Sequence, residues 1–273
     1  MGKNVENQRR PIGIFDSGIG GLTVAKAIKK QLSEEQLIYF GDTAHLPYGD
    51  KSTAAIQAYA VKICDLLLKQ NCKVILIACN SASAAAYELV REYVGSKAHV
   101  LNVIDPVVQY VGQHYQRRTV GLIGTKQTVH SNVYKKKIDD LDCGIHLKSL
   151  ATPLLAPMIE EGFFSNTISE SVIQTYLSDP SLAGIEALIL GCTHYPLIKE
   201  QIQAFYQGKV EVLDASDLVA NYVGHVLQQL NIASDALQGE PHFYVSDYTA
   251  SFEASTKIFF QQKVTLEHYP LWE

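Results

Sequence analysis

The sequence predicts an α/β protein built of two pseudo-symmetric lobes, each a mostly parallel sheet flanked by helices. The first observation is that short apolar runs alternate with stretches of helical periodicity along most of the 273 residues, which is typical of parallel sheets covered by helices. The second observation is an internal repeat. The segment GIFDSG (13–18) aligns with GLIGTK (121–126), and ILIACNS (75–81) aligns with LILGCTH (188–194).

The first lobe is predicted to span residues 11–104. Apolar runs at 11–16, 37–42, 73–80 and 99–105 predict its strands. The stretch 22–32 places its apolar residues on one helical face. Ser52 or Thr53 is expected to begin a long helix that runs to Lys69, and a helix from about 83 to 94 is expected to end at Gly95.

The second lobe is predicted to span residues 105–213. Pro106 can open its first helix, and strands are expected at 119–125, 145–151, 187–193 and 209–214. Helices are expected up to Asp140 and near 154–178. The segment 214–273 holds further helical runs and apolar runs at 242–247 and 263–269, and we expect it to pack back on the first lobe. The polar residues 1–10 are predicted to form a flexible N-terminal tail.

The composition is that of an ordinary globular protein, with 47% hydrophobic and 19% charged residues. A net charge of −5 argues against a nucleic-acid partner and against binding to a membrane surface. The sequence contains no run of about 18 apolar residues that would predict a membrane span, and its polar start does not resemble a signal peptide. Five cysteines, an odd number, then predict reduced thiols in a cytoplasmic protein.

Cys79 and Cys192 stand at equivalent places of the repeat, each at the carboxyl end of a predicted strand. Ligands of doubly wound sheets lie outside these strand ends, so two facing lobes place the active site in the cleft between them. Each cysteine is followed by a pair of residues able to cap a helix: Asn80 and Ser81, and Thr193 and His194. We therefore expect each thiol at a helix N-terminus, with a lowered pKa. The other three cysteines, Cys64, Cys72 and Cys143, are interpreted as structural.

Further candidate site residues lie in loops that follow predicted strands. DSGIGG (16–21) partly matches a dinucleotide-binding loop, but Thr23 replaces the third glycine and Asp16 would place a negative charge at the phosphate. We favour a loop whose amides hold a ligand carboxylate, with Asp16 facing an ammonium group or a thiol. HLPYGD (45–50) is either a plain turn or a rim of the cleft. His194 suits a proton-handling partner of Cys192, and Glu160 is either a solvated acid or a functional one.

Two thiols on opposite sides of a ligand suit a reaction that inverts a tetrahedral carbon. One base removes a proton from one face, and a second, protonated base returns a proton to the other face. The products are mirror images, so a near-symmetric cleft fits a near-symmetric reaction. This chemistry needs no cofactor and no metal, and no pair of cysteines has the spacing of a zinc knuckle.

Six segments together resemble the aspartate/glutamate racemase family, and within it the glutamate racemases: IGIFDSGIGGLTV, PYG, IACNSA, PMIEEG, LGCTHYPL and FYVSD. They occur in that family's order and spacing from Pro11 onward. The resemblance implies cofactor-independent interconversion of L- and D-glutamate, which supplies D-glutamate for peptidoglycan. It also implies the two-lobed fold.

The resemblance further implies individual roles. Cys79 would act on D-glutamate with the help of Asp16, and Cys192 would act on L-glutamate with the help of His194 and nearby Glu160. The residues implied in substrate binding, besides Asp16 and His194, are Ser17, Tyr48, Gly49, Asn80, Ser81, Thr125 and Thr193. Ser81 is a departure, because the family usually has Thr there; the hydroxyl is kept and a methyl group is lost.

Two alternatives stay open at this point. An aspartate racemase of the same family would share both cysteines and differ in the depth of the pocket. A two-lobed amino-acid binding protein without catalysis would lack a use for paired thiols. The expected partner is in each case a small-molecule substrate, and a homodimer is compatible with the sequence.

Overall fold

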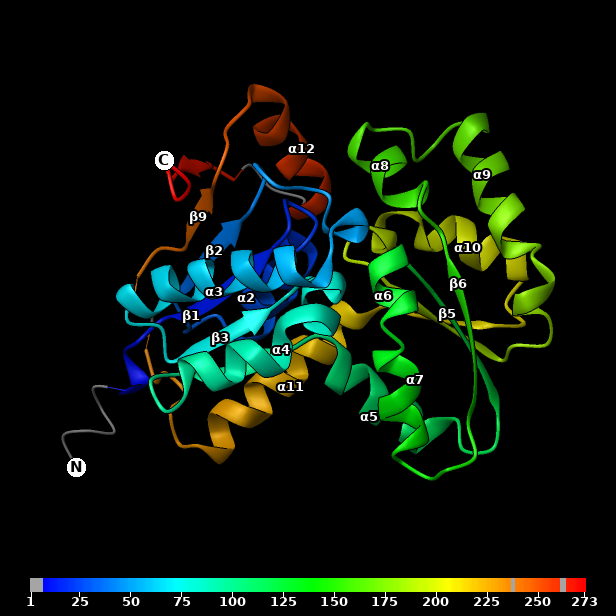
Figure 1. Ribbon diagram of the computed structural model, residues 1–273, viewed down its shortest axis with the longest axis horizontal. Coiled ribbons are helices and arrows are strands. Elements are labelled where there is room, and N and C mark those ends of the chain that lie inside the picture. The colour runs from blue at the N-terminus through cyan, green and yellow to red at the C-terminus, as the bar shows by residue number, and fades with distance from the viewer. Residues whose placement is uncertain (1–6, 237–238, 261–263) are drawn as a thin grey trace.

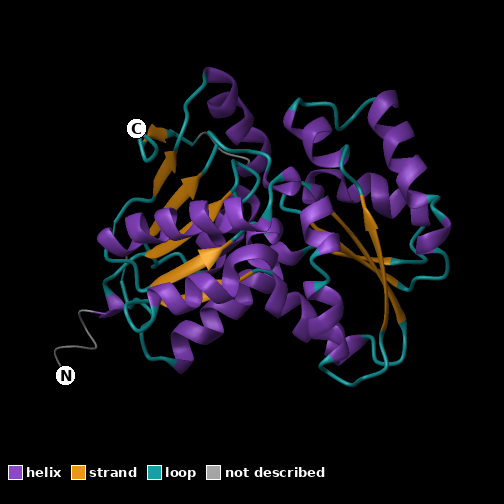
Figure 2. Cartoon of the chain, in the orientation of Figure 1, coloured by secondary structure: helices purple, strands orange, loops and turns teal. Residues whose placement is uncertain are grey.

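Two parallel sheets form the framework of the molecule, one in each lobe (Figure 2). The computed structural model describes residues 7–236, 239–260 and 264–273. The first sheet has the strand order β10-β9-β2-β1-β3-β4, and the second has the order β6-β5-β7-β8. All neighbouring strands pair in parallel.

The strands of the first sheet are β1 (Ile12–Asp16), β2 (Leu37–Gly41), β3 (Val74–Ile77), β4 (His99–Asn102), β9 (His242–Val245) and β10 (Glu267–His268). Those of the second sheet are β5 (Thr119–Gly124), β6 (His146–Ala151), β7 (Ala187–Gly191) and β8 (Glu211–Leu213). Every residue of β1, β2, β3 and β7 is buried, which explains why these strands read as continuous apolar runs.

The two sheets share one topology, which is the structural form of the internal repeat. The order β2-β1-β3-β4 in the first lobe corresponds to β6-β5-β7-β8 in the second. The repeated segments fall on β1 and β5 and on β3 and β7, the two central strands of each arrangement. The α/β fold of two sheets flanked by helices is therefore confirmed.

Helices cover both faces of the sheets (Figure 1). Those on the first sheet are α2 (Leu22–Gln31), α3 (Thr53–Lys69), α4 (Asn80–Val94), α11 (Ala215–Gln229) and α12 (Ala250–Phe260). The second lobe carries α5 (Ile104–His114), α6 (Lys126–His130), α7 (Val133–Asp139), α8 (Leu155–Glu160), α9 (Thr167–Leu177) and α10 (Lys199–Tyr206). Short 3₁₀ turns lie at Tyr48–Asp50, Pro180–Leu182 and Tyr195–Ile198.

The helix boundaries follow local signals in most places. The Ser52 side chain caps α3 by accepting a hydrogen bond from the amide of Ala55, and Gly95 ends α4 with a φ of 56°. Two starts differ from expectation. Helix α4 begins at Asn80 rather than near 83, because Cys79 is its N-cap, and α5 begins at Ile104, two residues before Pro106. The apolar run 263–269 pairs with β9 only at Glu267 and His268, and residue 263 lies outside the described chain.

The segment that follows the second lobe returns to the first. Helix α11 packs against α2 and also against α5, and β9 pairs with β2. A buried ion pair fastens this return, because Lys73 Nζ lies 2.6 Å from Glu35 Oε2 and donates to the carbonyl of Ile232 at 2.8 Å. None of the helices in the described part of the chain combines the length and apolar character that a membrane span requires.

Only the last four residues of the predicted N-terminal tail fall within the described chain. In them, the Arg10 guanidinium donates to the carbonyls of Asn71, Cys72 and Lys97. Residues 1–6 of the tail lie outside the described residues. Arg10 therefore fixes the start of the first lobe to the loops that precede β3 and β4.

Candidate active site

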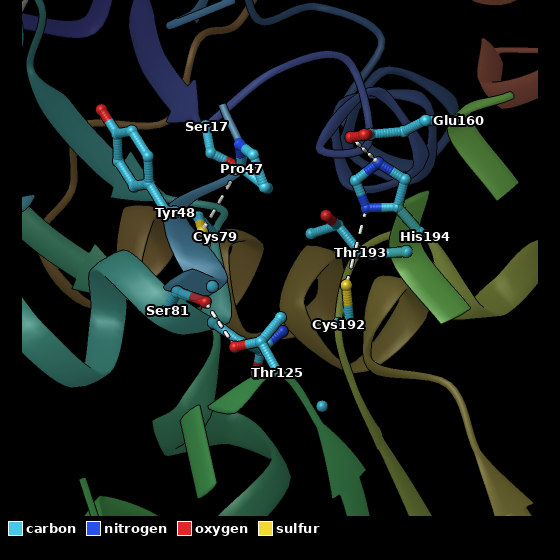
Figure 3. Close-up of a pocket in the computed structure, with 14 residues that line it drawn as sticks. Ser17, Pro47, Tyr48, Cys79, Ser81, Thr125, Glu160, Cys192, Thr193 and His194 are labelled. Carbon is cyan, nitrogen blue, oxygen red and sulfur yellow. Dashed lines mark hydrogen bonds and ion pairs between the residues drawn. The ribbon is translucent and has the colours of Figure 1, made fainter. Parts of the chain in front are cut away.

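A small cavity lies between the lobes, at the carboxyl ends of the central strands (Figure 3). The structure brings together around it all but one of the site residues predicted from the sequence: Ser17, Tyr48, Gly49, Cys79, Asn80, Ser81, Thr125, Glu160, Cys192, Thr193 and His194. The exception is Asp16, which is buried behind the cavity wall. Pro47, Ala156 and Gly191 complete the lining and carry no side-chain chemistry that would have marked them in the sequence.

Cys79 stands between β3 and α4 and caps the helix with its own sulfur. Its Sγ accepts a hydrogen bond from the amide of Ala82 at 3.4 Å, and its thiol lies 3.8 Å from the Ser17 hydroxyl. Burial raises the pKa of the Cys79 thiol to about 12, and the nearby Asp16 carboxyl raises it further than the Ala82 amide lowers it. The expected lowering of this pKa is therefore wrong, because the loss of water outweighs the helix terminus. In the closed site Cys79 is a protonated thiol.

We expect the free energy of unfolding to fall as the pH rises above about 9. The unfolded chain releases a thiol proton near the ordinary pKa of 9.0, whereas Cys72 and Cys79 hold theirs in the folded protein up to a pKa of about 12. Below pH 9 both states keep these protons and nothing changes. Above it the folded state binds more protons, so each such thiol costs about 1.4 kcal/mol of stability per pH unit.

Urea denaturation between about pH 8 and pH 10 measures this slope. The matched variant Cys72→Ala lacks one of the titrating thiols, so its stability should fall less steeply, whatever its starting value. Equal slopes for the two proteins would contradict the expectation.

Cys192 has a different environment from its counterpart. It is followed by the 3₁₀ turn Tyr195–Ile198, whose N-cap His194 makes no side-chain capping bond. The expected capping by Asn80, Ser81, Thr193 and His194 side chains is therefore wrong: the first helix is capped by the cysteine, and the second thiol has no α-helix directly behind it.

His194 connects Cys192 to Glu160 (Figure 3). Its Nδ1 lies 3.5 Å from Cys192 Sγ, and its Nε2 lies 2.8 Å from Glu160 Oε1. Burial lowers the pKa of His194, but the Cys192 sulfur and the Glu160 carboxylate together raise this pKa well above its ordinary value. The imidazolium form is thus favoured, and it stabilises negative charge on the Cys192 sulfur.

The Asp16 carboxylate lies in a turn made by its own loop. Its Oδ2 accepts from the amides of Gly18 (3.2 Å) and Gly21 (3.0 Å). The amides of Gly18 and Gly21 therefore bind the chain's own carboxylate and are not free for a ligand carboxylate. Burial raises the pKa of Asp16 against the opposing effects of His194 and the amides. Within the described chain, Oδ1 of Asp16 has no hydrogen-bond partner.

A group of hydroxyls joins the lobes on the other side of the cavity. Ser81 Oγ at the start of α4 lies 2.8 Å from Thr125 Oγ1, the N-cap of α6. Thr128 Oγ1 lies 3.1 Å from Thr125 Oγ1 and 3.4 Å from Ser81 Oγ. Asn80 is fixed from the second lobe, because the Tyr134 hydroxyl donates to its Oδ1 at 2.8 Å. The sequence did not single out Thr128 or Tyr134, since neither belongs to a strand-end motif.

The site is thus one cavity with an acid–base pair of unlike thiols. Cys79 is neutral and lies near a hydroxyl, whereas Cys192 lies beside an imidazolium; both can exchange protons with a ligand placed between them. Across the described ranges, no group of three or more His, Cys, Asp or Glu side chains is placed to bind a metal ion.

Known proteins resemble this chain along most of its length. A family model described as Asp/Glu/Hydantoin racemase matches residues 12–223. A glutamate racemase of Geobacter metallireducens is 39% identical over 246 residues, which cover 89% of this chain and 90% of that protein. A glutamate racemase of Streptococcus pneumoniae serotype 19F is 35% identical over 264 residues, or 96% of this chain and 99% of that one.

The structural comparison covers both lobes. The crystal structure of glutamate racemase from Francisella tularensis in complex with D-glutamate matches with a TM-score of 0.91 at 39% sequence identity. The match covers 97% of this chain and 99% of the Francisella chain.

Proposed function

The chain belongs to the Asp/Glu/hydantoin racemase family, and from this premise we propose that it interconverts L- and D-glutamate by a two-base mechanism at Cys79 and Cys192. The observation that carries the proposal is the pair of thiols. They leave equivalent strand ends of two lobes and lie on the two sides of one cavity (Figure 3).

The surroundings of the two thiols suit removal of a proton by Cys192, which lies beside His194, and delivery of a proton by Cys79. The Cys192 sulfur, stabilised by the His194 imidazolium, takes the α-proton of L-glutamate and leaves the bonding electron pair on a planar carbon. The neutral Cys79 thiol delivers its proton to the opposite face, which gives D-glutamate. The reverse reaction exchanges the two roles, and no redox change or group transfer takes place.

Helper residues account for the different surroundings of the thiols. His194 holds charge next to Cys192, and Glu160 keeps the imidazole charged and oriented. Asp16 does not line the cavity, and it acts on Cys79 electrostatically from behind the cavity wall. The hydroxyls and amides of Ser17, Ser81, Thr125 and Thr193 supply donors for the two carboxylates, together with the backbone at Tyr48 and Gly49.

A chiral assay tests the proposal. Purified protein without added pyridoxal phosphate or metal should convert L-glutamate and D-glutamate to the same equal mixture, and L-aspartate in a parallel sample should stay unchanged. Conversion of aspartate in preference to glutamate would make the protein an aspartate racemase, and binding of glutamate without conversion would make it a binding protein. We further propose that the D-glutamate serves peptidoglycan synthesis.

Isotope effects should separate the two helpers. The equilibrium constant between mirror images is one, so kcat/KM is equal in both directions for every variant and cannot tell which base was weakened. Asp16→Asn weakens the Cys79 side, so α-deuterated D-glutamate should show a larger kinetic isotope effect than in the unaltered protein. His194→Asn should raise the effect for α-deuterated L-glutamate. If both variants raise it for the same enantiomer, the assignment of helper to thiol is wrong.

A further inference from the structure

A buried carboxylate behind the cavity connects the rim of the site to a distant part of the chain. Asp42 is fully buried directly after β2, and its backbone amide donates to the carbonyl of Asp16 at 3.0 Å. Its Oδ2 accepts from the Tyr48 hydroxyl at 2.6 Å. Its Oδ1 accepts from the Ser246 hydroxyl and from the indole Nε1 of Trp272, both at 2.8 Å. Asp42 itself does not line the cavity.

Four side chains converge on this carboxylate, since His45 Nδ1 also lies 3.0 Å from Oδ2. They come from the loop after β2, from the end of β9 and from residue 272. An ionised carboxylate is only an acceptor, so it can satisfy all four, and charge-assisted hydrogen bonds of this kind are about twice as strong as neutral ones. The carboxylate therefore holds three separate segments of the chain at one point.

Trp272 is also held by packing. Its ring meets His45 edge-on, with the ring centroids 4.5 Å apart, and lies 5.5 Å from Tyr59. Lys62 Nζ lies 4.6 Å from the centroid of the indole, within the range of a cation–π contact. His45 in turn stacks on Tyr59 at 4.0 Å. The indole thus closes the outer side of the loop that carries Tyr48 and Gly49.

The position of this loop matters for the substrate. Tyr48 and Gly49 both line the cavity, and a Cβ atom on Gly49 would lie 2.7 Å from Thr125 Cβ in the second lobe. Gly49 therefore packs closely against Thr125 of the second lobe, whose side chain also lines the cavity. A shift of the rim changes the width of the cavity, and Cys79 and Cys192 need not move with it.

We propose that Asp42 and Trp272 are positioning residues for substrate binding, which hold the Tyr48–Gly49 rim in its binding position. The inference rests on the proposed racemase function and adds to it the part of the chain that sets the substrate rim. It separates binding from proton transfer, because neither residue touches a thiol.

The test compares variants that remove one contact each. Trp272→Phe removes the indole N–H and keeps an aromatic ring, whereas Tyr269→Phe changes the same segment at a side chain whose ring packs against Phe40 and Tyr244. In Trp272→Phe, KM for glutamate should rise about tenfold, the factor that corresponds to 1.4 kcal/mol of lost binding, while kcat stays within about twofold. Tyr269→Phe should match the unaltered protein.

Fluorescence gives a readout that does not depend on activity. Trp272 is the only tryptophan of the chain, so the emission of the protein reports this residue alone. In Asp42→Asn an amide with one acceptor oxygen replaces a carboxylate with two, so the four donors compete for one weaker acceptor and the indole emission should move to longer wavelength. Because Asp42→Asn also removes a buried charge and can unfold the lobe, the KM of Trp272→Phe decides the matter.

The outcomes are distinct. If the unaltered protein does not racemise glutamate, the proposed function fails and this inference fails with it. If it does, and Trp272→Phe leaves KM unchanged or lowers only kcat, the rim is not positioned by Trp272. An equal rise of KM in Tyr269→Phe would likewise overturn the inference, because it would show a general loosening of the segment.

Discussion

Replacement of Cys79 or of Cys192 by Ser should lower kcat for glutamate racemisation about 10²- to 10⁴-fold in both directions, the range expected for the loss of an acid–base group. A hydroxyl is a much weaker acid than a thiol, so it neither takes nor gives the α-proton at a useful rate. Either change stops both directions, because one base removes a proton while the other delivers one. A stopped chiral assay with each enantiomer measures the loss.

Cys143→Ser is the matched control, because Cys143 is a free, half-buried thiol outside the cavity. It should keep full activity. Alkylation adds a second measurement: glutamate should protect Cys79 and Cys192 from a thiol reagent, as mapped by peptide mass spectrometry. Protection of Cys64, Cys72 or Cys143 in their place would refute the assignment of the site.

Gly20→Ala should lower kcat/KM about 100-fold, the loss expected when catalytic groups shift by about 1 Å. A Cβ atom at Gly20 would lie 2.5 Å from His194 Cε1 and 2.7 Å from Thr193 Oγ1. Both atoms belong to the second lobe, so the added methyl group of Gly20→Ala clashes with that lobe. Either the His194 imidazole moves away from Cys192, or the two lobes move apart.

Gly18→Ala in the same loop is the matched control for Gly20→Ala. Its added Cβ would meet Leu46 at 3.5 Å, an ordinary contact, and no atom of the second lobe lies within 4 Å. Its kcat/KM should stay within about twofold of the unaltered protein, the effect of a change with little steric cost. Similar losses in both variants would mean that the loop as a whole, and not the approach to His194, limits activity.

The sequence predicted the features that are encoded locally or by repetition. Alternating apolar runs predicted the two parallel sheets, and the repeat of the segments around Cys79 and Cys192 predicted that these thiols belong to one site. Caps such as Ser52 and Gly95 were readable because each acts on its own helix. The residues around the cavity could be named because they follow strand ends, where parallel sheets bring ligands.

The remaining features depend on contacts between distant parts of the chain. The high pKa of Cys79 comes from its burial in the folded protein, and the position of a cysteine at a helix N-terminus does not predict that burial. The role of Asp42 could not be read from the sequence, because its donors Ser246 and Trp272 lie more than 200 residues away. The amides of DSGIGG were assigned to a ligand, since the sequence does not show that Asp16 folds back onto them.

Under the proposed two-base mechanism, the free protein exists in two forms that differ only in which of the two buried thiols carries a proton. Cys79 is 6% exposed and Cys192 is 8% exposed, so water reaches neither freely in the closed state. Under the proposed mechanism, conversion of one L-glutamate leaves the proton on Cys192 and removes it from Cys79, and that form accepts only D-glutamate. The protonation state of the free protein therefore depends on which enantiomer it converted last, until the two thiols exchange protons again. At high concentrations of one enantiomer, we therefore expect the return between the two forms to limit the turnover rate.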